Sequence, residues 1–258
     1  MQETRALLLA AGIGSRLRPY TEHWPKCLMP IQGRPLLEYW FSTLQKMGIH
    51  NVLVNTHCHA DIVLDFIQRP SFVGWVKPSY EKKLLGTAGT LRANKDFFKD
   101  HTILLVHADN LCCCDFSEFL NFHQNERPPG TSMTMMTFET PAPSTCGIVE
   151  VDVDGIVYGF YEKVSNPPGN LANAAVYLLE PEVIDWIMKN PEISDFSTEV
   201  LPYFSGKIAT WKNESVHRDI GTIEMLRVAQ KDDCLLPIWP KDSWDKIFLT
   251  NPIHELIL

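Results

Sequence analysis

The stretch LLLAAGIGSRL, residues 7–17, organises the rest of the chain. Its first five residues are apolar without a break, which predicts a strand buried on both faces of a parallel sheet. The run then meets Gly12 and Gly14, where the missing Cβ permits a tight turn and lets a phosphate approach the backbone amides. Arg16 follows on the same loop, and Lys26 comes ten residues later. A glycine loop with two cations at its rim suits a triphosphate.

The glycine spacing excludes two well-known phosphate-binding loops. No third glycine follows at the spacing of the dinucleotide fingerprint, and no Gly-Lys-Ser/Thr completes a P-loop. On its own, Gly-x-Gly also fits an ordinary turn after a strand, with Arg16 and Lys26 merely solvated. The specificity of the signal therefore depends on the residues that follow.

The longer string also contains Pro19, Thr21 and PKCLMP at residues 25–30. It resembles the signature of the sugar-1-phosphate nucleotidyltransferases, L-x-A-A-G-x-G-S/T-R-L-x-P-x-T followed by P-K-x-L-x-P, and the resemblance extends roughly over residues 5–229. It implies a Rossmann-like α/β fold with a mixed, mostly parallel sheet and helices on both faces. It also implies transfer of a nucleotidyl group from a nucleoside triphosphate to a sugar 1-phosphate.

Composition is that of an ordinary globular chain of 258 residues, 45% hydrophobic and 21% charged, with a net charge of −8. Such an acidic chain is a poor general binder of nucleic acid or anionic membranes. No apolar run approaches the roughly 20 residues that span a bilayer, and no signal peptide is apparent. We expect a cytoplasmic protein with small-molecule substrates and no nucleic-acid or membrane partner, and a homo-oligomer is left open.

Seven cysteines include the consecutive triplet 112–114. Neighbouring residues of a strand point to opposite faces, so the triplet is a poor disulfide framework. No pair of C-x-x-C motifs suggests zinc. We expect small buried thiols in a reducing compartment.

Hydrophobic periodicity predicts alternating strands and helices, hence a parallel sheet with right-handed crossovers. The predicted strands span residues 51–55, 73–80 (interrupted or ended by Pro78), 102–108, 132–138, 148–153, 156–161, 173–179 and 208–212. The predicted helices span residues 34–47, 61–67, 116–124, 181–188, 196–203 and 222–231, with another ending near residue 98. We expect one domain with a nucleotide-binding part (1–125), a sugar-phosphate-binding part (126–233) and a tail (234–258) that packs on the domain or on another subunit. The end of the sequence shows no hexapeptide repeat, so we expect no C-terminal β-helix.

Two aspartates are the candidate metal ligands. Asp109 follows a predicted buried strand, at the sheet edge where α/β proteins bind ligands, and a carboxylate there suits Mg²⁺. Asp219 lies in VHRDIGT, residues 216–222, which resembles the late Asp-Ile/Val-Gly-Thr motif of the family. The alternatives are a helix cap for Asp109 and an ordinary turn for Asp219, with Thr222 as the N-cap of the next helix.

The resemblance implies the remaining site residues. Arg16 and Lys26 would neutralise the triphosphate, and Lys163 would orient the sugar phosphate. The sugar-phosphate set comprises Gly147, Glu162, Lys163 and Asn173. The nucleotide set comprises Leu9, Ala10, Ala11, Gly12, Gly14, Ser15, Glu81, Gly86 and Thr87. The Glu162-Lys163 pair also fits a solvated strand end.

The loop LGTAG, residues 85–89, looks most like that of mannose-1-phosphate guanylyltransferases. The carboxylate of Glu81 would accept hydrogen bonds from guanine, so GTP and mannose 1-phosphate are the expected substrates, although Lys83 and Leu84 depart from the pattern. The alternatives are heptose or glucose 1-phosphate, UTP, dTTP or CTP as the nucleotide, a choline-phosphate cytidylyltransferase, and a non-catalytic relative that binds a nucleotide sugar.

Overall fold

The computed structural model describes residues 3–255. It separates into two compact units, each assembled from distant parts of the chain. Within the described residues, the first combines residues 3–5, Leu85–Val106 and Cys114–Ser215, and the second combines Ala6–Leu84, His107–Cys113 and residues 216–255.

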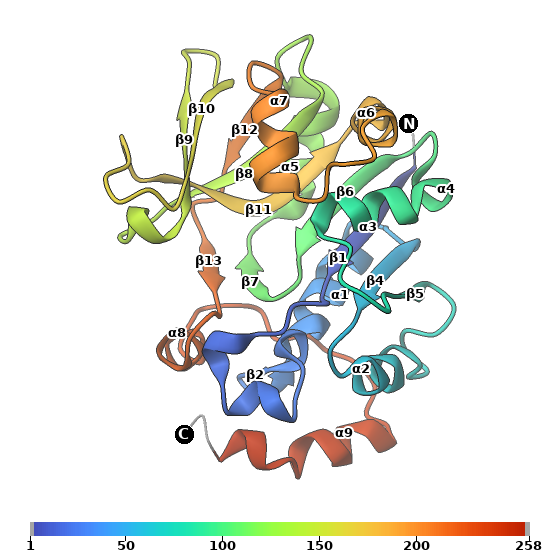
Figure 1. Cartoon of the computed structure of the whole chain (residues 1–258). Coiled ribbons are helices and arrows are strands. Elements are labelled where there is room, and N and C mark those ends of the chain that lie inside the picture. Colours follow the sequence, from blue (N-terminus) through green and yellow to red (C-terminus); the bar gives the residue numbers. More distant parts are fainter. Residues whose placement is uncertain (1–2, 256–258) are drawn as a thin grey trace. The chain divides into compact units, whose positions relative to one another are not determined.

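The second unit is built on parallel strands. Strands β1 (Thr4–Leu9), β4 (Val52–Thr56) and β5 (Val76–Tyr80) run side by side, with Leu8 opposite Val54 and Val54 opposite Pro78 (Figure 1). Leu7 and Leu8 are fully buried, as the apolar run predicts. Strand β5 begins three residues later than predicted and continues through Pro78. Among the described strands of this unit, β5 pairs with β4 alone, and proline is tolerated on such an edge.

The second unit also contains α-helices, and aromatic side chains pack around the first of them. The helices are α1 (Leu36–Lys46), α2 (Ala60–Ile67), α8 (Ile223–Ala229) and α9 (Ser243–Leu249). Phe41 of α1 lies 5.8 Å from Phe66 and 4.8 Å from Phe72, centroid to centroid. Helix α1 begins two residues later than predicted, because residues 34–35 form β3 (Arg34–Pro35), which pairs with β2 (Pro30–Ile31).

A short ladder links two distant segments of the second unit. Strand β7 (Asn110–Cys113) pairs antiparallel with β13 (Val216–Asp219), with Asn110 opposite Asp219. Periodicity predicts neither strand, because each has only four residues. The ladder is nevertheless what brings residues 109 and 219 together.

The expectation that the cysteine triplet forms no disulfide is wrong. Cys113 is bonded to Cys234, 121 positions away, just beyond α8. Neighbouring residues of β7 point to opposite faces, and Cys112, beside Cys113, is buried and takes no part in the disulfide. The partner comes from a distant segment, so local spacing carries no signal of the bond.

The C-terminal segment packs on the second unit, as one of the two alternatives predicts. Figure 1 shows α9 at the red end of the chain. Trp244 of α9 lies 4.8 Å from Phe66, centroid to centroid. Arg69 is 3% exposed and binds three carboxylates, at 2.7 Å from Glu38, 2.8 Å from Asp242 and 2.9 Å from Asp245. The last two also form the capping box of α9, so one guanidinium joins α1, the end of α2 and α9.

The first unit is built on antiparallel strands around a long central one. Its strands are β6 (Thr102–His107, whose last residue belongs to the second unit), β8 (Met133–Glu139), β9 (Gly147–Val151), β10 (Val157–Glu162), β11 (Leu171–Leu179) and β12 (Ile208–Lys212). Strand β11 pairs antiparallel with β6, β8 and β9, and β12 pairs parallel with β8. The predicted hairpin of β9 and β10 is confirmed. Met133, Met135 and Met136 are fully buried core residues.

Short helices complete the first unit. They are α3 (Thr87–Ala93), α4 (Lys95–Phe98), α5 (Phe116–Asn121), α6 (Pro181–Lys189) and α7 (Leu201–Tyr203), with π-helical turns at Phe122–Glu126 and Phe196–Val200. Helix α5 is capped by Asp115, whose side chain accepts a hydrogen bond from Ser117 N at 2.9 Å. Asp109 is therefore not the cap of this helix.

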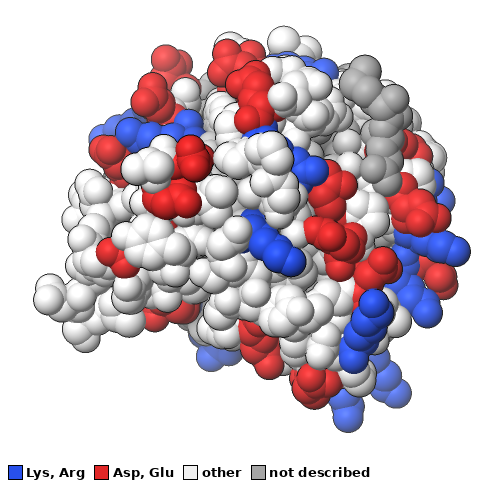
Figure 2. Space-filling model, turned by 90° about the horizontal axis from the view of Figure 1, so that it is seen from above, with Lys and Arg blue, Asp and Glu red and all other residues white. Residues whose placement is uncertain are grey.

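Surface charge and helix length bear on the expected partners. On the face drawn in Figure 2, basic side chains are scattered among acidic ones rather than gathered into one area. Within residues 3–255, every helix is too short or too polar to cross a bilayer.

Candidate active site

The side chain of Asn55 holds the backbone at the start of the glycine loop, directly after β1. Sequence reasoning missed this residue. Asn55 Oδ1 accepts hydrogen bonds from Ala10 N at 2.6 Å and Ala11 N at 3.1 Å. Gly14 has a φ of 64°, and a Cβ there would lie 2.8 Å from Thr21 Cγ2. The turn therefore requires glycine at this position. The available signal for Asn55 is that a polar residue follows the apolar residues 52–54 near the end of β4.

Lys26 joins the two predicted metal ligands. Its Nζ lies 2.7 Å from Asp109 Oδ2 and 3.2 Å from Asp219 Oδ1, and its side chain is only 6% exposed. Arg16 is 66% exposed, and its guanidinium lies 3.2 Å from Asp219 Oδ2. The structure thus brings together four side chains that the sequence spreads over residues 16–219.

Three backbone arrangements bring these side chains together. Ala108 N donates to Leu9 O at 3.0 Å, which holds residue 109 beside the end of β1. The pairing of Asn110 with Asp219 aligns the second carboxylate. Trp40 Nε1 donates to Asn110 O at 2.9 Å and anchors the start of β7 to the core. Asp219 thus lies in β13, and Asp109 lies in the short turn that directly precedes β7.

A small pocket of about 200 Å³ lies at this cluster. Its lining residues are Gly14, Ser15, Arg16, Lys26, Asp109 and Gly221. A Cβ at Gly221 would lie 2.6 Å from the Arg16 guanidinium, so a side chain at this position would displace the end of this arginine. Gly221 is a second residue that sequence reasoning missed, although it belongs to the Asp-Ile-Gly-Thr motif. Thr222 does cap α8, accepting from Met225 N at 3.2 Å.

Opposing effects act on the Asp219 carboxyl. Burial raises its pKa, but the charges and hydrogen bonds of Lys26 and Arg16 outweigh burial and hold the pKa below its usual range. Asp219 is therefore ionised at neutral pH. Burial lowers the pKa of His217 on the same strand to about 4, so that imidazole is neutral.

The carboxylate pair fits a hard divalent cation. Oxygens of Asp109 and Asp219 already share one cation, the Lys26 ammonium. Mg²⁺ takes oxygen ligands and commonly uses one or two carboxylates together with phosphate oxygens. In the part of the chain that the structure describes, no group of three or more His, Cys, Asp or Glu side chains could hold a metal. A Mg²⁺ ion here would be held by Asp109 and Asp219 and complete its shell from a ligand.

Glu81 lies behind the glycine loop. It is 3% exposed, and its Oε1 accepts a hydrogen bond from Asn55 Nδ2 at 2.9 Å. Asn55 thus bridges Glu81 and the amides of residues 10–11. The role of Glu81 in base recognition stays a prediction.

The predicted sugar-phosphate residues gather in the first unit. Gly147 pairs with Glu162 across β9 and β10, and a Cβ at Gly147 would lie 2.6 Å from Glu162 Oε2. Lys163 Nζ lies 2.9 Å from Glu162 Oε1. Asn173 Nδ2 donates to the hydroxyl of Tyr177 at 2.6 Å, so Tyr177, for which the sequence predicted no role, orients this amide.

Gly86 and Thr87 also belong to the first unit, at the start of α3. A Cβ at Gly86 would collide with the carbonyl oxygen of Ser194. Thr87 Oγ1 accepts a hydrogen bond from Phe196 N at 2.6 Å. Both residues are thereby tied to the segment 194–196, and their predicted contact with the nucleotide stays a prediction.

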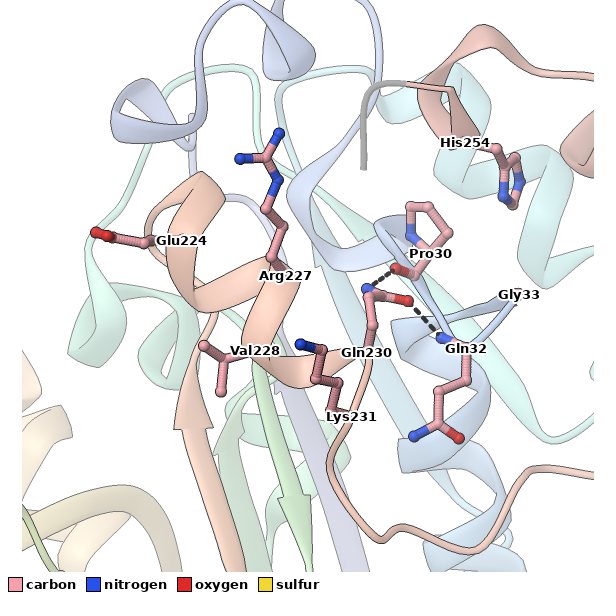
Figure 3. Close-up of a pocket in the computed structure, with 9 residues that line it drawn as sticks. All are labelled: Pro30, Gln32, Gly33, Glu224, Arg227, Val228, Gln230, Lys231 and His254. Carbon is pink, nitrogen blue, oxygen red and sulfur yellow. Dashed lines mark hydrogen bonds between the residues drawn. The ribbon is translucent and has the colours of Figure 1, made fainter. Parts of the chain in front are cut away.

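A larger cavity of about 1040 Å³ lies elsewhere in the second unit, between α8, the β2–β3 hairpin and His254 (Figure 3). Gln230 joins α8 to the hairpin: its side chain accepts a hydrogen bond from Gln32 N at 2.8 Å and donates one to Pro30 O at 2.9 Å. In Figure 3, Glu224 and Arg227 of α8 lie on the opposite side of the view from His254. This cavity contains none of the predicted site residues, so its size does not make it the active site.

Comparison with known proteins gives the chain its relatives. The model of the nucleotidyl transferase family matches residues 5–234. A mannose-1-phosphate guanylyltransferase of Mycobacterium tuberculosis is 30% identical over 224 residues, covering 85% of this chain and 61% of that protein. A mannose-1-phosphate guanyltransferase of Debaryomyces hansenii is 28% identical, covering 84% and 61%. The chain thus spans less than two thirds of both proteins.

Two further relatives complete the comparison. A UTP–glucose-1-phosphate uridylyltransferase of Synechocystis is 31% identical over 286 positions, covering 97% of this chain and 73% of that protein. A crystal structure from Bacillus anthracis, described as a glucose-1-phosphate thymidylyltransferase, matches with a TM-score of 0.77 and 19% identity, covering 94% of this chain and 99% of the other. This likeness confirms the predicted fold class, a mixed α/β sheet with helices.

Proposed function

Because the chain belongs to the nucleotidyl transferase family, we propose that it transfers a nucleotidyl group to a sugar 1-phosphate. The preferred pair is GTP and mannose 1-phosphate. The observation that carries the proposal is the convergence of Arg16, Lys26, Asp109 and Asp219 beside the Gly14 turn. Two cations and two carboxylates at one small pocket are what a triphosphate and its magnesium require.

The proposed reaction is an in-line displacement. A phosphate oxygen of the sugar 1-phosphate attacks the α-phosphorus, the bond to the β-phosphate oxygen breaks, and pyrophosphate leaves. The attacking oxygen is already an anion, so no general base is needed. Catalysis then consists of positioning and charge stabilisation. Bound Mg²⁺ would supply positive charge at the phosphates.

The side chains have distinct roles in this proposal. Arg16 is exposed and free to follow the phosphates, whereas Lys26 acts from a buried position. Lys163 orients the sugar phosphate, and Glu162 and Asn173 bind sugar hydroxyls. An Asn173 amide fixed by Tyr177 presents its remaining hydrogen-bonding groups in one orientation.

Two arguments favour guanine as the base of the nucleotide. The loop at residues 85–89 resembles that of mannose-1-phosphate guanylyltransferases, and two relatives of this chain carry that name. A carboxylate that accepts from N1–H and the exocyclic amine of guanine discriminates against bases without these donors. Glu81 would have to exchange its hydrogen bond with Asn55 for such contacts.

A second candidate pair is UTP and glucose 1-phosphate. The observation that favours it is the uridylyltransferase of Synechocystis, whose match covers 97% of this chain. Both pairs use the same phosphate chemistry at Arg16 and Lys26. They differ in the base and in the sugar hydroxyls.

Pyrophosphate release tests the proposal. The purified chain is assayed with five nucleoside triphosphates against mannose, glucose and manno-heptose 1-phosphates, with Mg²⁺. We expect the highest kcat/KM for GTP with mannose 1-phosphate. UTP or CTP exceeding GTP with every sugar would overturn the base assignment alone. An absence of pyrophosphate release with every pair would overturn the reaction class.

A further inference from the structure

Lys26 occupies the position between Asp109 and Asp219 that the proposed function gives to a metal. We infer that Lys26 is the resident counter-ion of this carboxylate pair, and that a divalent cation binds the pair only when the Lys26 ammonium leaves it. This inference rests on the proposed function, because it takes the two aspartates as the metal ligands. It adds a competition between Lys26 and the metal for the same oxygens.

The contacts of Lys26 are those of a buried counter-ion. One nitrogen lies within 3.2 Å of an oxygen from each carboxylate, and the side chain is almost fully buried. The Asp109 side chain is 30% exposed and the Asp219 side chain 51% exposed, so a cation from solvent can reach the carboxylates more readily than solvent reaches the ammonium. Charge-assisted contacts of this length are among the strong polar interactions of proteins.

Only the end of the Lys26 side chain is free to move. Its backbone begins the 3-10 turn Lys26–Leu28, where Cys27 and Leu28 are buried, and a Cβ on Gly14 would lie 3.3 Å from Lys26 Cβ. Leu28 N donates to Pro25 O at 3.0 Å and closes that turn. A displaced ammonium therefore stays near the pocket formed by Gly14, Ser15 and Arg16, where an anion would lie.

Electrostatics makes the two cations mutually exclusive at the carboxylates. An ammonium and a divalent ion that share the same two oxygens would lie a few ångströms apart and repel each other. Metal entry therefore releases Lys26 from the carboxylates, and the released charge becomes available to a phosphate. Without a metal, the ammonium of Lys26 offsets one of the two negative charges of the pair and lowers its affinity for a further cation.

Arg16 provides an internal comparison. Among the ion pairs of the described residues, its guanidinium takes part in one, with Asp219 at 3.2 Å, and its side chain is mostly exposed. Such an exposed contact is weak. Removing Arg16 therefore relieves much less competition for a metal than removing Lys26.

The test measures metal affinity without any substrate. Mn²⁺ is titrated into chelator-treated protein, and free Mn²⁺ is followed by electron paramagnetic resonance. Lys26→Met keeps the aliphatic stem and removes the charge. We expect it to bind one Mn²⁺ about tenfold or more tightly than the unmodified chain. Lys77→Met removes an exposed charge elsewhere in the second unit and should leave the affinity unchanged.

Two further variants sharpen the result. Lys26→Met combined with Asp109→Asn should lose the gain in affinity, and Arg16→Met should gain less than about threefold. Circular dichroism and Tm check that each variant folds, and Lys26→Gln replaces Lys26→Met if the latter does not.

The outcomes separate this inference from the proposed function. Equal or weaker Mn²⁺ binding by folded Lys26→Met and Lys26→Gln would overturn the counter-ion role. Pyrophosphate release by the unmodified chain would then still support the reaction. A gain in affinity that survives Asp109→Asn would also overturn the inference, because the metal would bind elsewhere.

Discussion

The ammonium of Lys26 lies 2.7 Å from Oδ2 of Asp109, although 83 positions separate these residues in the chain. The contact is made where the loop after β1 meets the residue that precedes β7. It joins the predicted phosphate-binding cation to a predicted metal ligand. Both functions therefore depend on one buried charge.

Lys26→Met should lower turnover by about two to three orders of magnitude, the effect of removing one preorganised charge-stabilising group. The measurement is kcat for pyrophosphate release at saturating substrates. Lys77→Met is the matched control and should keep its activity. Near-normal turnover in folded Lys26→Met would remove this lysine from the mechanism.

Asp109→Asn and Asp219→Asn should each raise the Mg²⁺ concentration for half-maximal activity by about tenfold or more, because an amide lacks the charge that a hard cation prefers. Activity is measured over a Mg²⁺ series after treatment with a chelator. Asp115→Asn, at the cap of α5, serves as a control and should leave the Mg²⁺ dependence unchanged. Full activity without divalent cation would contradict the assignment of both aspartates.

Arg69→Met should lower the free energy of unfolding by about 3–5 kcal/mol, because it leaves three carboxylates without their buried partner. Arg34→Met is the comparison, since Arg34 reaches Glu38 and Asp245 only at 3.6 and 3.8 Å. Its cost should be about 1 kcal/mol or less. Denaturant unfolding measures both, and equal costs would show that the short contacts of Arg69 do not determine its effect.

Cys234→Ser should lower Tm, because the bond from Cys113 closes a loop with a sequence separation of 121. The chain-entropy model gives an upper value of about 4–5 kcal/mol for a loop of this size. Cys114→Ser replaces a free, half-buried thiol of the same triplet and is the control. A reductant should lower the Tm of the unmodified chain but not that of Cys234→Ser. An unmodified chain whose Tm is insensitive to reductant would argue against the bond.

His123 should make stability fall as pH falls from 7.5 to 5.5. Burial lowers its pKa below 6.5 in the folded chain, against the opposing effect of Glu180, and Arg127 adds to the lowering. The unfolded chain therefore takes up the proton first, and stability is lost as pH falls through about 6.5. Glu180 has a lowered pKa, through its contact with His123 and the charge of Arg127, so its contribution is lost only below about pH 4.5.

The measurement for His123 is Tm against pH for the unmodified chain and for His123→Gln. The variant should lose less Tm between pH 7.5 and 5.5, because glutamine does not titrate. His217 titrates in both proteins and does not alter the comparison. Identical pH profiles would show that His123 does not contribute to acid sensitivity.

Local patterns were sufficient for most elements of the fold. The apolar run at residues 7–9, the hairpin around Gly155 and the helix closed by Gly48 were all predicted, because each depends on neighbours along the chain. The ends of elements were less predictable. Arg34 and Pro35 were predicted to begin a helix but form a hairpin strand instead, because their pairing with residues 30–31 competes with helical propensity.

The sequence by itself determined which residues carry the charges, since Arg16, Lys26, Asp109 and Asp219 lie in motifs whose residue types and spacing are informative without coordinates. Only the tertiary structure decided that Lys26 lies between the two aspartates and that Asn55 binds the glycine loop. The same is true of the disulfide bond between Cys113 and Cys234. Each of these contacts joins segments 44 to 193 positions apart. Which distant segments meet depends on how the strands pair and pack, and a local pattern carries no information about that pairing.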